Sequence, residues 1–297
     1  MTGGESPALR EALAAALGAK LSPAAWRPVH GGCIAQSFRA EAPTGPVFVK
    51  LADGARLPML EAEQESLGIL AAAGALRVPA PLAVGEAKGQ AFLALEWIDL
   101  GPGTPEAEAQ LGAGLAALHR CLAPRFGLAH DNFIGSTPQP NGEKDDWVAF
   151  LRDRRLGFQL ELAAKNGHGG RMQDRGCRLL EQLEVFFATY RPRPSLLHGD
   201  LWGGNWGVDS VGRPVIFDPA VYHGDREADL AMTRLFGGFG AAFYAAYVRE
   251  WPLDAAAGTR RDLYNLYHVL NHLNLFGGGY RAQAEGMIDR LLAAIGH

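Results

Sequence analysis

Apolar residues in the first hundred positions follow both helical and strand spacings. Leu9, Leu13 and Leu17 lie four residues apart after Ser6-Pro7, so a helix is expected to open the chain. Short β-branched and aromatic runs then alternate with turn residues, which is typical of strands. The spacing predicts strands at 34–42, 46–51 and 91–97 and a helix at about 58–73.

Helical spacing dominates the rest of the chain. Thr104, followed by a proline, begins a helix that carries Leu111, Leu115 and Leu118. The exception is 196–219, where Gly, Asn and Pro interrupt two short apolar runs and predict a loop followed by a small hairpin. Further helices are expected at about 146–165, 174–190, 227–236, 241–251, 260–275 and 280–295.

The change of pattern falls near residue 100. Leu100-Gly101-Pro102-Gly103 combines residues that are typical of a hinge, and 297 residues exceed the usual size of one compact domain. The sequence therefore predicts an α+β protein of two lobes. The expected lobes are residues 1–100, with a sheet and helices, and residues 101–297, mainly helical.

Composition narrows the class of partner. The 28 basic and 32 acidic side chains leave a net charge of −4 without a basic block, which argues against nucleic-acid and membrane-surface binding and favours a small-molecule partner. Residues 1–17 mix charged residues with alanine, which predicts neither a signal peptide nor a spanning segment. Three dispersed cysteines indicate a reducing compartment, the cytoplasm by default. Helical apolar surroundings predict that Cys121 and Cys177 are buried.

The segment 198–205, His-Gly-Asp-Leu-Trp-Gly-Gly-Asn, carries the most chemical information. Asp200 precedes Asn205 by five positions, and Asp218 follows at the end of an apolar run. This spacing matches the catalytic base, metal-binding Asn and metal-binding Asp of kinases. Such a loop can turn the first carboxylate toward a hydroxyl and the amide oxygen toward Mg²⁺, which prefers oxygen ligands. Asp and Asn residues taken one at a time are common in turns, so the prediction of a kinase site rests on the combination of all three.

A kinase loop also calls for an upstream lysine, an acidic partner and a glycine-rich turn. Lys50 ends an apolar strand, and Gly31-Gly32 precedes the first strand. Among the glutamates of the following helix, Glu63 is expected to face the core because Leu67 lies four positions later. The alternatives are an edge-strand lysine that reaches water and an ordinary two-glycine turn.

These residues together resemble the fructosamine (ketosamine) kinases, within the aminoglycoside phosphotransferase-like kinases. The resemblance covers nearly the whole chain, and Trp202 and residues 135–141 are its narrower marks. It implies a protein-kinase-like fold with an antiparallel sheet in the N-terminal lobe and a larger, mainly helical C-terminal lobe. The matching stretches are 30–34, 46–50, 131–141, 198–205, 217–220, 226–231 and 267–272.

The resemblance implies an ATP- and Mg²⁺-dependent kinase that phosphorylates the 3-hydroxyl of a ketosamine, free or protein-bound, and so promotes deglycation. Asp200 would accept the hydroxyl proton, while Asn205 and Asp218 would hold Mg²⁺. Lys50, paired with Glu63, would hold the nucleotide phosphates together with the glycine turn. The hinge residues expected beside adenine are Glu96, Trp97 and Ile98.

Several residues are candidates for the sugar side of the site. Trp202 has an aromatic face that suits the apolar face of a sugar or an alkylamine. The polar helix around 267–272 supplies further candidates, for which core packing is the alternative. These helix candidates are His268, Asn271 and His272.

Three further residues are assigned supporting roles. His198 and Asp229 are expected to organise the catalytic loop rather than to transfer protons. Cys33, in the glycine turn, could oxidise or join a second chain, so a monomer or a Cys33-linked dimer is expected. An inert turn residue is the alternative for Cys33.

Other functions explain the same residues less well. A strongly acidic acceptor pocket would favour a kinase for another hydroxylated amine, such as an aminoglycoside or a choline-like compound, and the sequence does not display one clearly. A metal hydrolase using His198, Asp200 and Asp218 as ligands leaves Lys50 unexplained. A non-catalytic nucleotide-binding regulator would have lost the base or a metal ligand, and here all are present. The preferred sugar and amine stay open.

Overall fold

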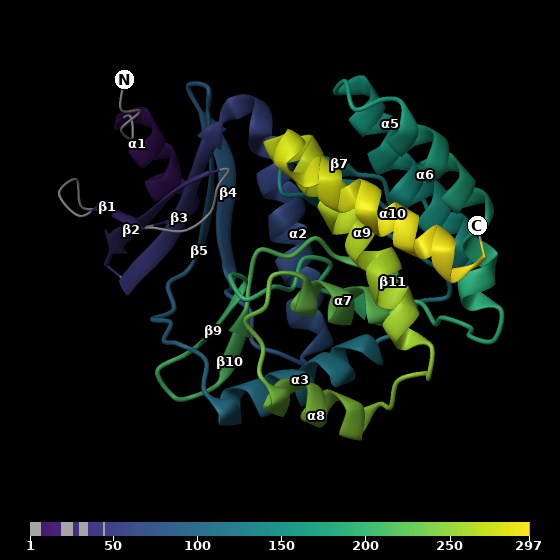
Figure 1. Cartoon of the computed structure of the whole chain (residues 1–297). Helices are drawn as coiled ribbons and strands as arrows, with labels where there is room; N and C mark the ends of the chain where they lie inside the picture. The colour runs from purple at the N-terminus through teal and green to yellow at the C-terminus, as the bar shows by residue number, and fades with distance from the viewer. Residues whose placement is uncertain (1–6, 19–25, 30–34, 44, 297) are drawn as a thin grey trace. The chain divides into compact units, whose positions relative to one another are not determined.

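The structure is a computed structural model that describes residues 7–18, 26–29, 35–43 and 45–296. These residues form two compact units, shown along the chain in Figure 1. The hairpin segment 207–217 packs with the first unit, although in sequence it lies within the lobe predicted to be C-terminal. The first unit comprises residues 1–102 and 207–217, and the second comprises residues 103–206 and 218–297.

An antiparallel sheet forms the centre of the first unit. Its strand order is β1-β2-β3-β5-β4, and β3 pairs with β5 from Val47 opposite Glu96 to Asp53 opposite Gln90. The sequence patterns located β2, β3 and β5 but missed the two outer strands, because β4 begins at a proline and contains Gly85. The strands are β1 (Arg27–Val29), β2 (Gln36–Ala42), β3 (Gly45–Asp53), β4 (Pro81–Ala87) and β5 (Gln90–Glu96).

Two helices, α1 (Pro7–Ala16) and α2 (Leu57–Ala73), cover opposite faces of this sheet (Figure 1). Leu9 and Leu13 of α1 belong to one apolar cluster with Val49 and Phe92 of the sheet. Because side chains alternate along a strand, Lys50 and Leu93, which are register partners, point to the face that α2 covers. A short 3₁₀ turn, η1 (Gly54–Arg56), leads into α2.

The second unit is mainly helical, as predicted, and the α+β class is confirmed. The helix α9 runs through its apolar core, where Leu263, Leu266 and Leu270 are fully buried. The predicted helix at 146–165 contains a π-helical turn, η2. The helical elements are α3 (Pro105–His119), α4 (Trp147–Phe150), η2 (Leu151–Leu156), α5 (Gly157–Lys165), α6 (Arg171–Glu181), η3 (Leu183–Phe187), α7 (Glu227–Leu235), α8 (Ala241–Glu250), α9 (Ala257–Phe276), η4 (Gly278–Tyr280) and α10 (Arg281–Ala294).

Short antiparallel pairs hold the loops between the helices. β8 pairs with β11, so that Leu197 lies opposite Tyr222 at the point where the 198–205 loop begins. β9 and β10 form the hairpin predicted within 196–219. The pairs are β6 (Asn132–Ile134) with β7 (Thr137–Gln139), β8 (Ser195–Leu197) with β11 (Tyr222–Gly224), and β9 (Trp206–Val208) with β10 (Pro214–Ile216).

The cysteine prediction is wrong for Cys177, which is exposed, while Cys121 is half-buried. Cys177 lies on α6 beside the face that buries Met172 and Leu179, so its apolar neighbours point away from it. Cys33 lies outside the described residues.

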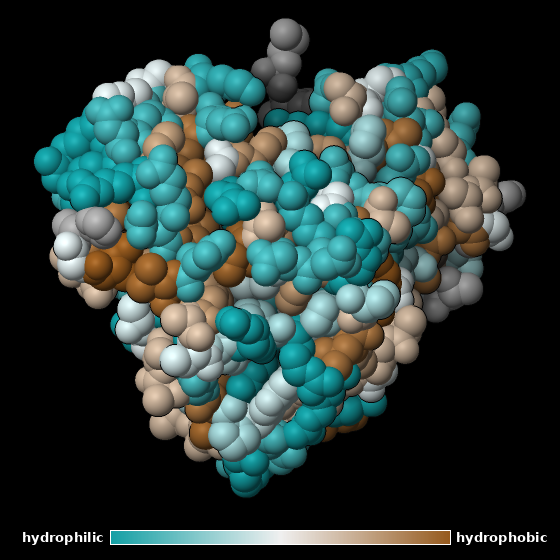
Figure 2. Space-filling model, turned by 90° about the vertical axis from the view of Figure 1, so that its right-hand side faces the viewer, coloured by the Kyte–Doolittle hydropathy of each residue, from teal (hydrophilic) through white to brown (hydrophobic). Residues whose placement is uncertain are grey.

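In the described part of the chain, no helix combines the length and apolarity needed to cross a membrane. On the face in Figure 2, hydrophobic residues form separate patches among hydrophilic ones.

Close contact between α3 and α8 depends on Gly112. A Cβ atom at this position would lie 2.2 Å from the carbonyl oxygen of Phe243. We expect Gly112→Ala to lower the free energy of unfolding by about 2 kcal/mol or more, because backbone cannot yield as a flexible side chain does. Urea unfolding of the full chain measures this change.

The matched control is Gly68→Ala in α2, where an added Cβ meets nothing within 4 Å. This substitution should stabilise the protein by about 0.5–1 kcal/mol, since glycine disfavours a helix interior. Equal effects of the two substitutions would contradict the close-contact explanation.

Candidate active site

The backbone of the 198–205 loop is held by a single buried carboxylate. Asp229, on α7, is 1% exposed. Its Oδ2 accepts a hydrogen bond from the His198 amide at 2.8 Å, and its Oδ1 accepts one from the Gly199 amide at 2.9 Å. A carboxylate that accepts two backbone N–H groups fixes both their position and the start of the loop.

A buried histidine completes the surroundings of Asp229. His119 Nε2 lies 3.2 Å from Asp229 Oδ2, and His119 Nδ1 lies 2.8 Å from the Tyr247 hydroxyl. Burial lowers the pKa of His119, so the imidazole is neutral and donates through Nε2. Burial alone would raise the pKa of Asp229, but the hydrogen bond from His119 and the charge and backbone interactions around it lower the pKa below its usual value.

Glycine is required at position 199. Its φ of +83° is in the region that L side chains rarely adopt, and a Cβ atom would lie 2.0 Å from the Ala220 carbonyl oxygen. The adjacent carbonyl of His198 accepts a hydrogen bond from the Ala220 amide at 2.8 Å. At Gly199 the loop therefore contacts the backbone of the 218–220 segment so closely that no side chain fits between them. Asp200 is the next residue after this contact.

The three residues predicted for catalysis and metal binding lie together. The Asn205 amide nitrogen is 2.9 Å from the Asp200 carbonyl oxygen and 3.4 Å from both Asp200 Oδ2 and the Asp218 carbonyl oxygen. Because the amide nitrogen of Asn205 bonds these oxygens, its amide oxygen is the atom of the side chain that remains for a further ligand. Asp218 has a left-handed φ of +55°, a conformation that costs energy in a non-glycine residue.

Two negative charges in a small volume perturb Asp200. Burial is the largest cause that raises its pKa to about 7, and the charges of Asp218 and Asp229 add to it, while the Asn205 hydrogen bond acts in the opposite direction. Repulsion of this kind marks a place where a cation would be stabilised. Among the described residues, no group of three or more His, Cys, Asp or Glu side chains is arranged to hold a metal alone.

In the first unit, Lys50 and Glu63 form an ion pair. Lys50 Nζ lies 2.7 Å from Glu63 Oε1, and both side chains are mostly buried. Glu61 and Glu65, the other glutamates at the start of α2, are exposed. The pair orients the lysine ammonium beside the sheet, as the spacing of α2 predicts. Gly31 and Gly32 lie outside the described residues.

The predicted hinge residues are tied to the β9–β10 hairpin by an arginine that the sequence did not reveal. Arg77 donates to Glu96 Oε1 at 2.7 Å and also bonds the Asp209 carboxylate in the hairpin turn. Its carbonyl oxygen accepts a hydrogen bond from the Ile216 amide at 3.0 Å. The side chain of Glu96 is thus engaged inside the first unit, and its backbone amide donates to the Ala80 carbonyl oxygen at 2.8 Å. No periodicity in the sequence singles out Arg77.

The remaining hinge residues are partly buried beyond the end of β5. Trp97 Nε1 donates to Asp99 at 2.8 Å, and the Arg39 guanidinium lies 5.2 Å from the centre of the Trp97 ring. Ile98 lies outside the strands, so its backbone groups are not used in the sheet.

The substrate candidates divide into a buried and a partly exposed group. His268 and Asn271 are packed inside the second unit; Asn271 Oδ1 accepts a hydrogen bond from Gln159 at 3.2 Å. Burial lowers the pKa of His268 to about 3. Trp202, 38% exposed, and the half-buried His272 remain accessible. Core packing, the alternative considered for this helix, therefore describes the surroundings of His268 and Asn271.

The accessible pair belongs to a chain of aromatic rings, which we call the aromatic cluster. Trp202 meets Phe236 edge-on at 6.3 Å, and Phe236 lies 4.8 Å from His272. The His272 ring is 5.5 Å from Phe276 and 5.2 Å from Tyr280. Phe236 and Phe276 are 41% and 53% exposed, and they lie next to one another in the cluster through His272 rather than singly on the surface. The cluster consists of Trp202, Phe236, His272, Phe276 and Tyr280.

Gly204 allows Trp202 to lie against the loop. A Cβ atom at position 204 would lie 2.3 Å from the Trp202 ring. The indole therefore sits over the backbone of the loop that carries Asp200 and begins the aromatic cluster there.

Comparisons with known proteins agree with this geometry. The family model of fructosamine kinase matches residues 6–294. A probable ketoamine kinase of Synechocystis is 43% identical over 90% of both chains. The chloroplastic protein-ribulosamine 3-kinase of Arabidopsis thaliana is 41% identical over 89% of this chain and 81% of its own length.

Solved structures show the same fold. A candidate fructosamine-3-kinase of Haemophilus somnus superposes with a TM-score of 0.87 at 26% identity, over 96% of this chain and 97% of that chain. An aminoglycoside phosphotransferase, in a complex with ADP and hygromycin B, superposes with a TM-score of 0.66 at 17% identity, over 98% and 99%. The chain thus has the protein-kinase-like fold of small-molecule phosphotransferases. Within that class, it belongs to the fructosamine kinase family.

The crowded charges around Asp200 predict a pH-dependent stability. Because its folded-state pKa lies above that of an unfolded aspartate, the folded chain binds more protons between about pH 4 and pH 7, and stability falls as pH rises through this window. We expect Asp200→Asn to raise the Tm of the metal-free protein by about 2–4 °C at pH 8 and to have little effect near pH 4.

The control is Glu161→Gln, an exposed carboxyl on α5. Thermal unfolding of both variants across pH 4–8 measures the difference. A pH-independent effect of Asp200→Asn would show that its ionisation does not oppose folding.

Proposed function

We propose that this chain is an ATP-dependent kinase that transfers a phosphoryl group to the 3-hydroxyl of ketosamines, the adducts of a sugar with a lysine side chain or small amine. Phosphorylation destabilises the adduct, so the role is protein deglycation. The proposal rests on the contacts of Asn205 with both Asp200 and Asp218. Asp229 holds the backbone of the loop that carries Asp200 and Asn205. The similarity to ketoamine and ribulosamine kinases supports the substrate class.

Asp200 is the residue we assign as catalytic base. A base acts best when its pKa lies near the working pH, and the surroundings of Asp200 raise its pKa in that direction. The fixed backbone at Gly199 and the hydrogen bond from Asn205 hold the carboxylate in place, so the attacking hydroxyl is positioned as its proton is taken.

Asn205 and Asp218 fit a magnesium ion. The inward amide nitrogen of Asn205 leaves its oxygen as a ligand, and Asp218 adds a carboxylate. Mg²⁺ commonly takes few protein ligands and completes its coordination with substrate phosphates and water. When bound, the ion neutralises the phosphate charge. A cation there would also relieve the repulsion that Asp218 exerts on Asp200.

ATP binding is assigned to the first unit. Lys50, oriented by Glu63, is the side chain we assign to the nucleotide phosphates, and the hinge backbone at 96–98 is assigned to adenine. The lobe of residues 1–100 would thus bind nucleotide, and residues 101–297 would supply catalysis and substrate binding. Arg77 joins the hinge to the β9–β10 hairpin, so it supports both the adenine segment and the approach to Asp218.

The aromatic cluster favours a ketosamine over a highly charged acceptor. Its exposed faces suit the apolar side of a sugar and the alkyl chain of a lysine or small amine. An aminoglycoside-like acceptor, which carries several ammonium groups, would need anionic side chains that the cluster does not supply. The complete set of base, amide and lysine argues against a non-catalytic regulator. The cytoplasmic location and the Cys33-linked dimer stay predictions.

ADP release in the presence of Mg²⁺ tests the function. We expect turnover with ribulosyl-, erythrulosyl- or fructosyl-lysine but not with kanamycin or choline. Asp200→Asn should lower kcat by about 10²–10⁴-fold and leave ATP binding intact, because only the proton acceptor is lost. Nucleotide binding without turnover on any ketosamine would preserve the fold assignment and remove the deglycation role.

Removing the outermost ring tests the substrate side. Phe276→Ala should raise KM for an alkyl ketosamine about 3–10-fold with little change in kcat, since one aromatic contact is worth about 0.5–1.5 kcal/mol. Val185→Ala, which shortens an exposed apolar side chain outside the cluster, is the control. An unchanged KM for Phe276→Ala would place the substrate elsewhere.

A further inference from the structure

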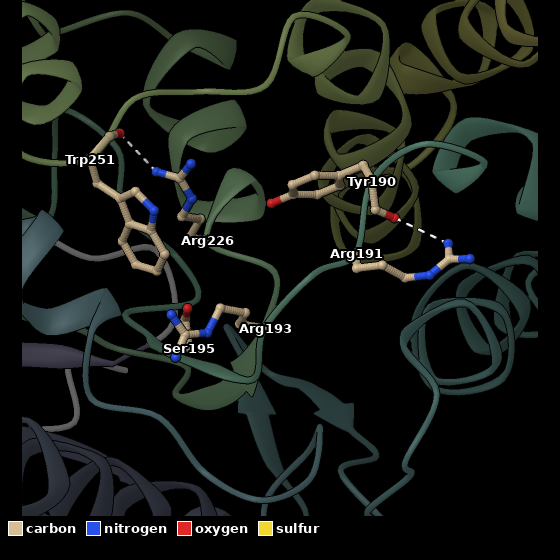
Figure 3. A pocket seen from close by; sticks show the side chains of 6 residues that line it. All are labelled: Tyr190, Arg191, Arg193, Ser195, Arg226 and Trp251. Atoms are coloured by element: carbon tan, nitrogen blue, oxygen red, sulfur yellow. Dashed lines mark hydrogen bonds between the residues drawn. The ribbon is translucent and has the colours of Figure 1, made fainter.

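A small cavity lies in the second unit among residues that the kinase reaction does not use (Figure 3). Its volume is about 170 Å³. It is formed where the end of η3, the start of β8, the start of α7 and the end of α8 come together. The lining residues are Tyr190, Arg191, Arg193, Ser195, Arg226 and Trp251.

Positive charge is concentrated around this cavity. Arg191, Arg193 and Arg226 line it, and a further guanidinium, that of Arg120, lies 5.9 Å from the Trp251 ring. Three arginines line the cavity although the whole chain carries a net charge of −4, and one of them, Arg191, donates to the Phe187 carbonyl oxygen at 2.9 Å. Such a local excess attracts anions, and guanidinium groups suit planar or tetrahedral oxyanions.

The nearest carboxylates are already occupied. Asp225 accepts hydrogen bonds from Tyr190 at 3.0 Å and from Tyr264, and it is fully buried. Glu227 is paired with Arg260 at 2.8 Å. Glu250, at the end of α8, lies 3.5 Å from Arg249. Among the described residues, none of these three carboxylates forms an ion pair with a guanidinium group that lines the cavity.

Arg226 forms a fixed wall of the cavity. Its guanidinium donates to the carbonyl oxygens of Trp251 at 2.9 Å and Pro252 at 2.5 Å, and it lies 4.2 Å from the Trp251 ring. Figure 3 shows it beside Trp251, with the Tyr190 hydroxyl pointing toward it. The carbonyl oxygens fix the position of this guanidinium without forming an ion pair with it.

Two lining groups lack partners of their own. Ser195 is 1% exposed, and its hydroxyl has no hydrogen-bond partner within the described part of the chain. A buried hydroxyl without a partner is costly, so such a group commonly marks a place where a ligand or water binds. The exposed guanidinium of Arg193 likewise has no hydrogen bond or ion pair with any described residue.

We infer that this cavity is a binding site for a small oxyanion of the phosphate class, either inorganic phosphate or the phosphate group of a small monoester. Arg193 and the Ser195 hydroxyl are the donors, and Arg226 supplies fixed positive charge. The aromatic rings of Tyr190 and Trp251 limit its width. The site is independent of the proposed kinase reaction.

A continuous set of contacts connects the site to the catalytic loop. Arg226 Nη1 lies 3.4 Å from the Tyr247 hydroxyl, which lies 2.8 Å from His119 Nδ1. His119 contacts Asp229, whose carboxylate holds the His198 and Gly199 amides. An anion that attracts Arg226 therefore acts on the residues that position Asp200.

Calorimetric titration of the full-length protein tests the site. The protein is saturated with Mg²⁺ and a non-hydrolysable ATP analogue, so that the nucleotide phosphate positions are filled. Inorganic phosphate and glycerol phosphate are titrated separately at constant ionic strength, which distinguishes the two sources. We expect one site with a Kd of about 1 mM or tighter.

Variants locate the binding. Arg193→Gln and Ser195→Ala should each weaken binding about tenfold or more, because each removes a hydrogen bond to a charged ligand. The matched control, Arg290→Gln, removes an exposed arginine on α10 and should leave the affinity unchanged. Absence of binding to both probes, or equal affinity in Arg193→Gln and the unaltered chain, would overturn the proposal.

The effect of the bound anion on the 198–205 loop is tested by measuring kcat. Added phosphate at constant ionic strength should change kcat in the unaltered chain and in Arg290→Gln, but not in Arg193→Gln. Binding without any change in kcat would keep the site and remove the connection to Asp200.

Discussion

The carboxylate of Asp229 is the interaction on which the rest of the site depends. It joins α7 to the backbone of the loop at His198 and Gly199, and the glycine then passes the 218–220 segment at a distance that admits no side chain. Asp200 and Asn205 follow from that fixed start. A charged acceptor buried with its donors satisfied is rigid, and this rigidity supplies the positioning on which phosphoryl transfer relies.

The same site carries unfavourable features that a purely structural loop would not need. Asp218 has a left-handed backbone, and its charge adds to the burial that raises the pKa of Asp200. Both cost stability in the absence of ligands, and both are consistent with the cation and the acceptor hydroxyl that we propose to bind between Asp200, Asn205 and Asp218. The Lys50–Glu63 pair, in contrast, is satisfied within the first unit before any nucleotide arrives.

Sequence patterns predicted those features of the molecule that depend on residues close together in the sequence. The five-residue spacing from Asp200 to Asn205 and the helical spacing behind Glu63 could be read directly, because each depends on neighbours in sequence. Arg77 could not be found, since its partners lie 19 and 132 residues away. Phe276 was missed although its ring partners His272 and Tyr280 lie only four positions away, because the sequence does not show that its side chain is exposed. His268 and Asn271, on the helix expected to face the sugar, instead lie inside the core, because sequence alone does not reveal which face α9 buries.

The position of the phosphate on the product decides whether this chain is a ketosamine 3-kinase. Nuclear magnetic resonance of the product formed from ribulosyl-lysine, ATP and Mg²⁺ would locate the phosphate through its coupling to carbon-bound hydrogens. The family of the chain predicts a single phosphate on the oxygen of the third sugar carbon. Phosphate on another oxygen, or release of ADP with no sugar phosphate at all, would contradict a ketosamine 3-kinase.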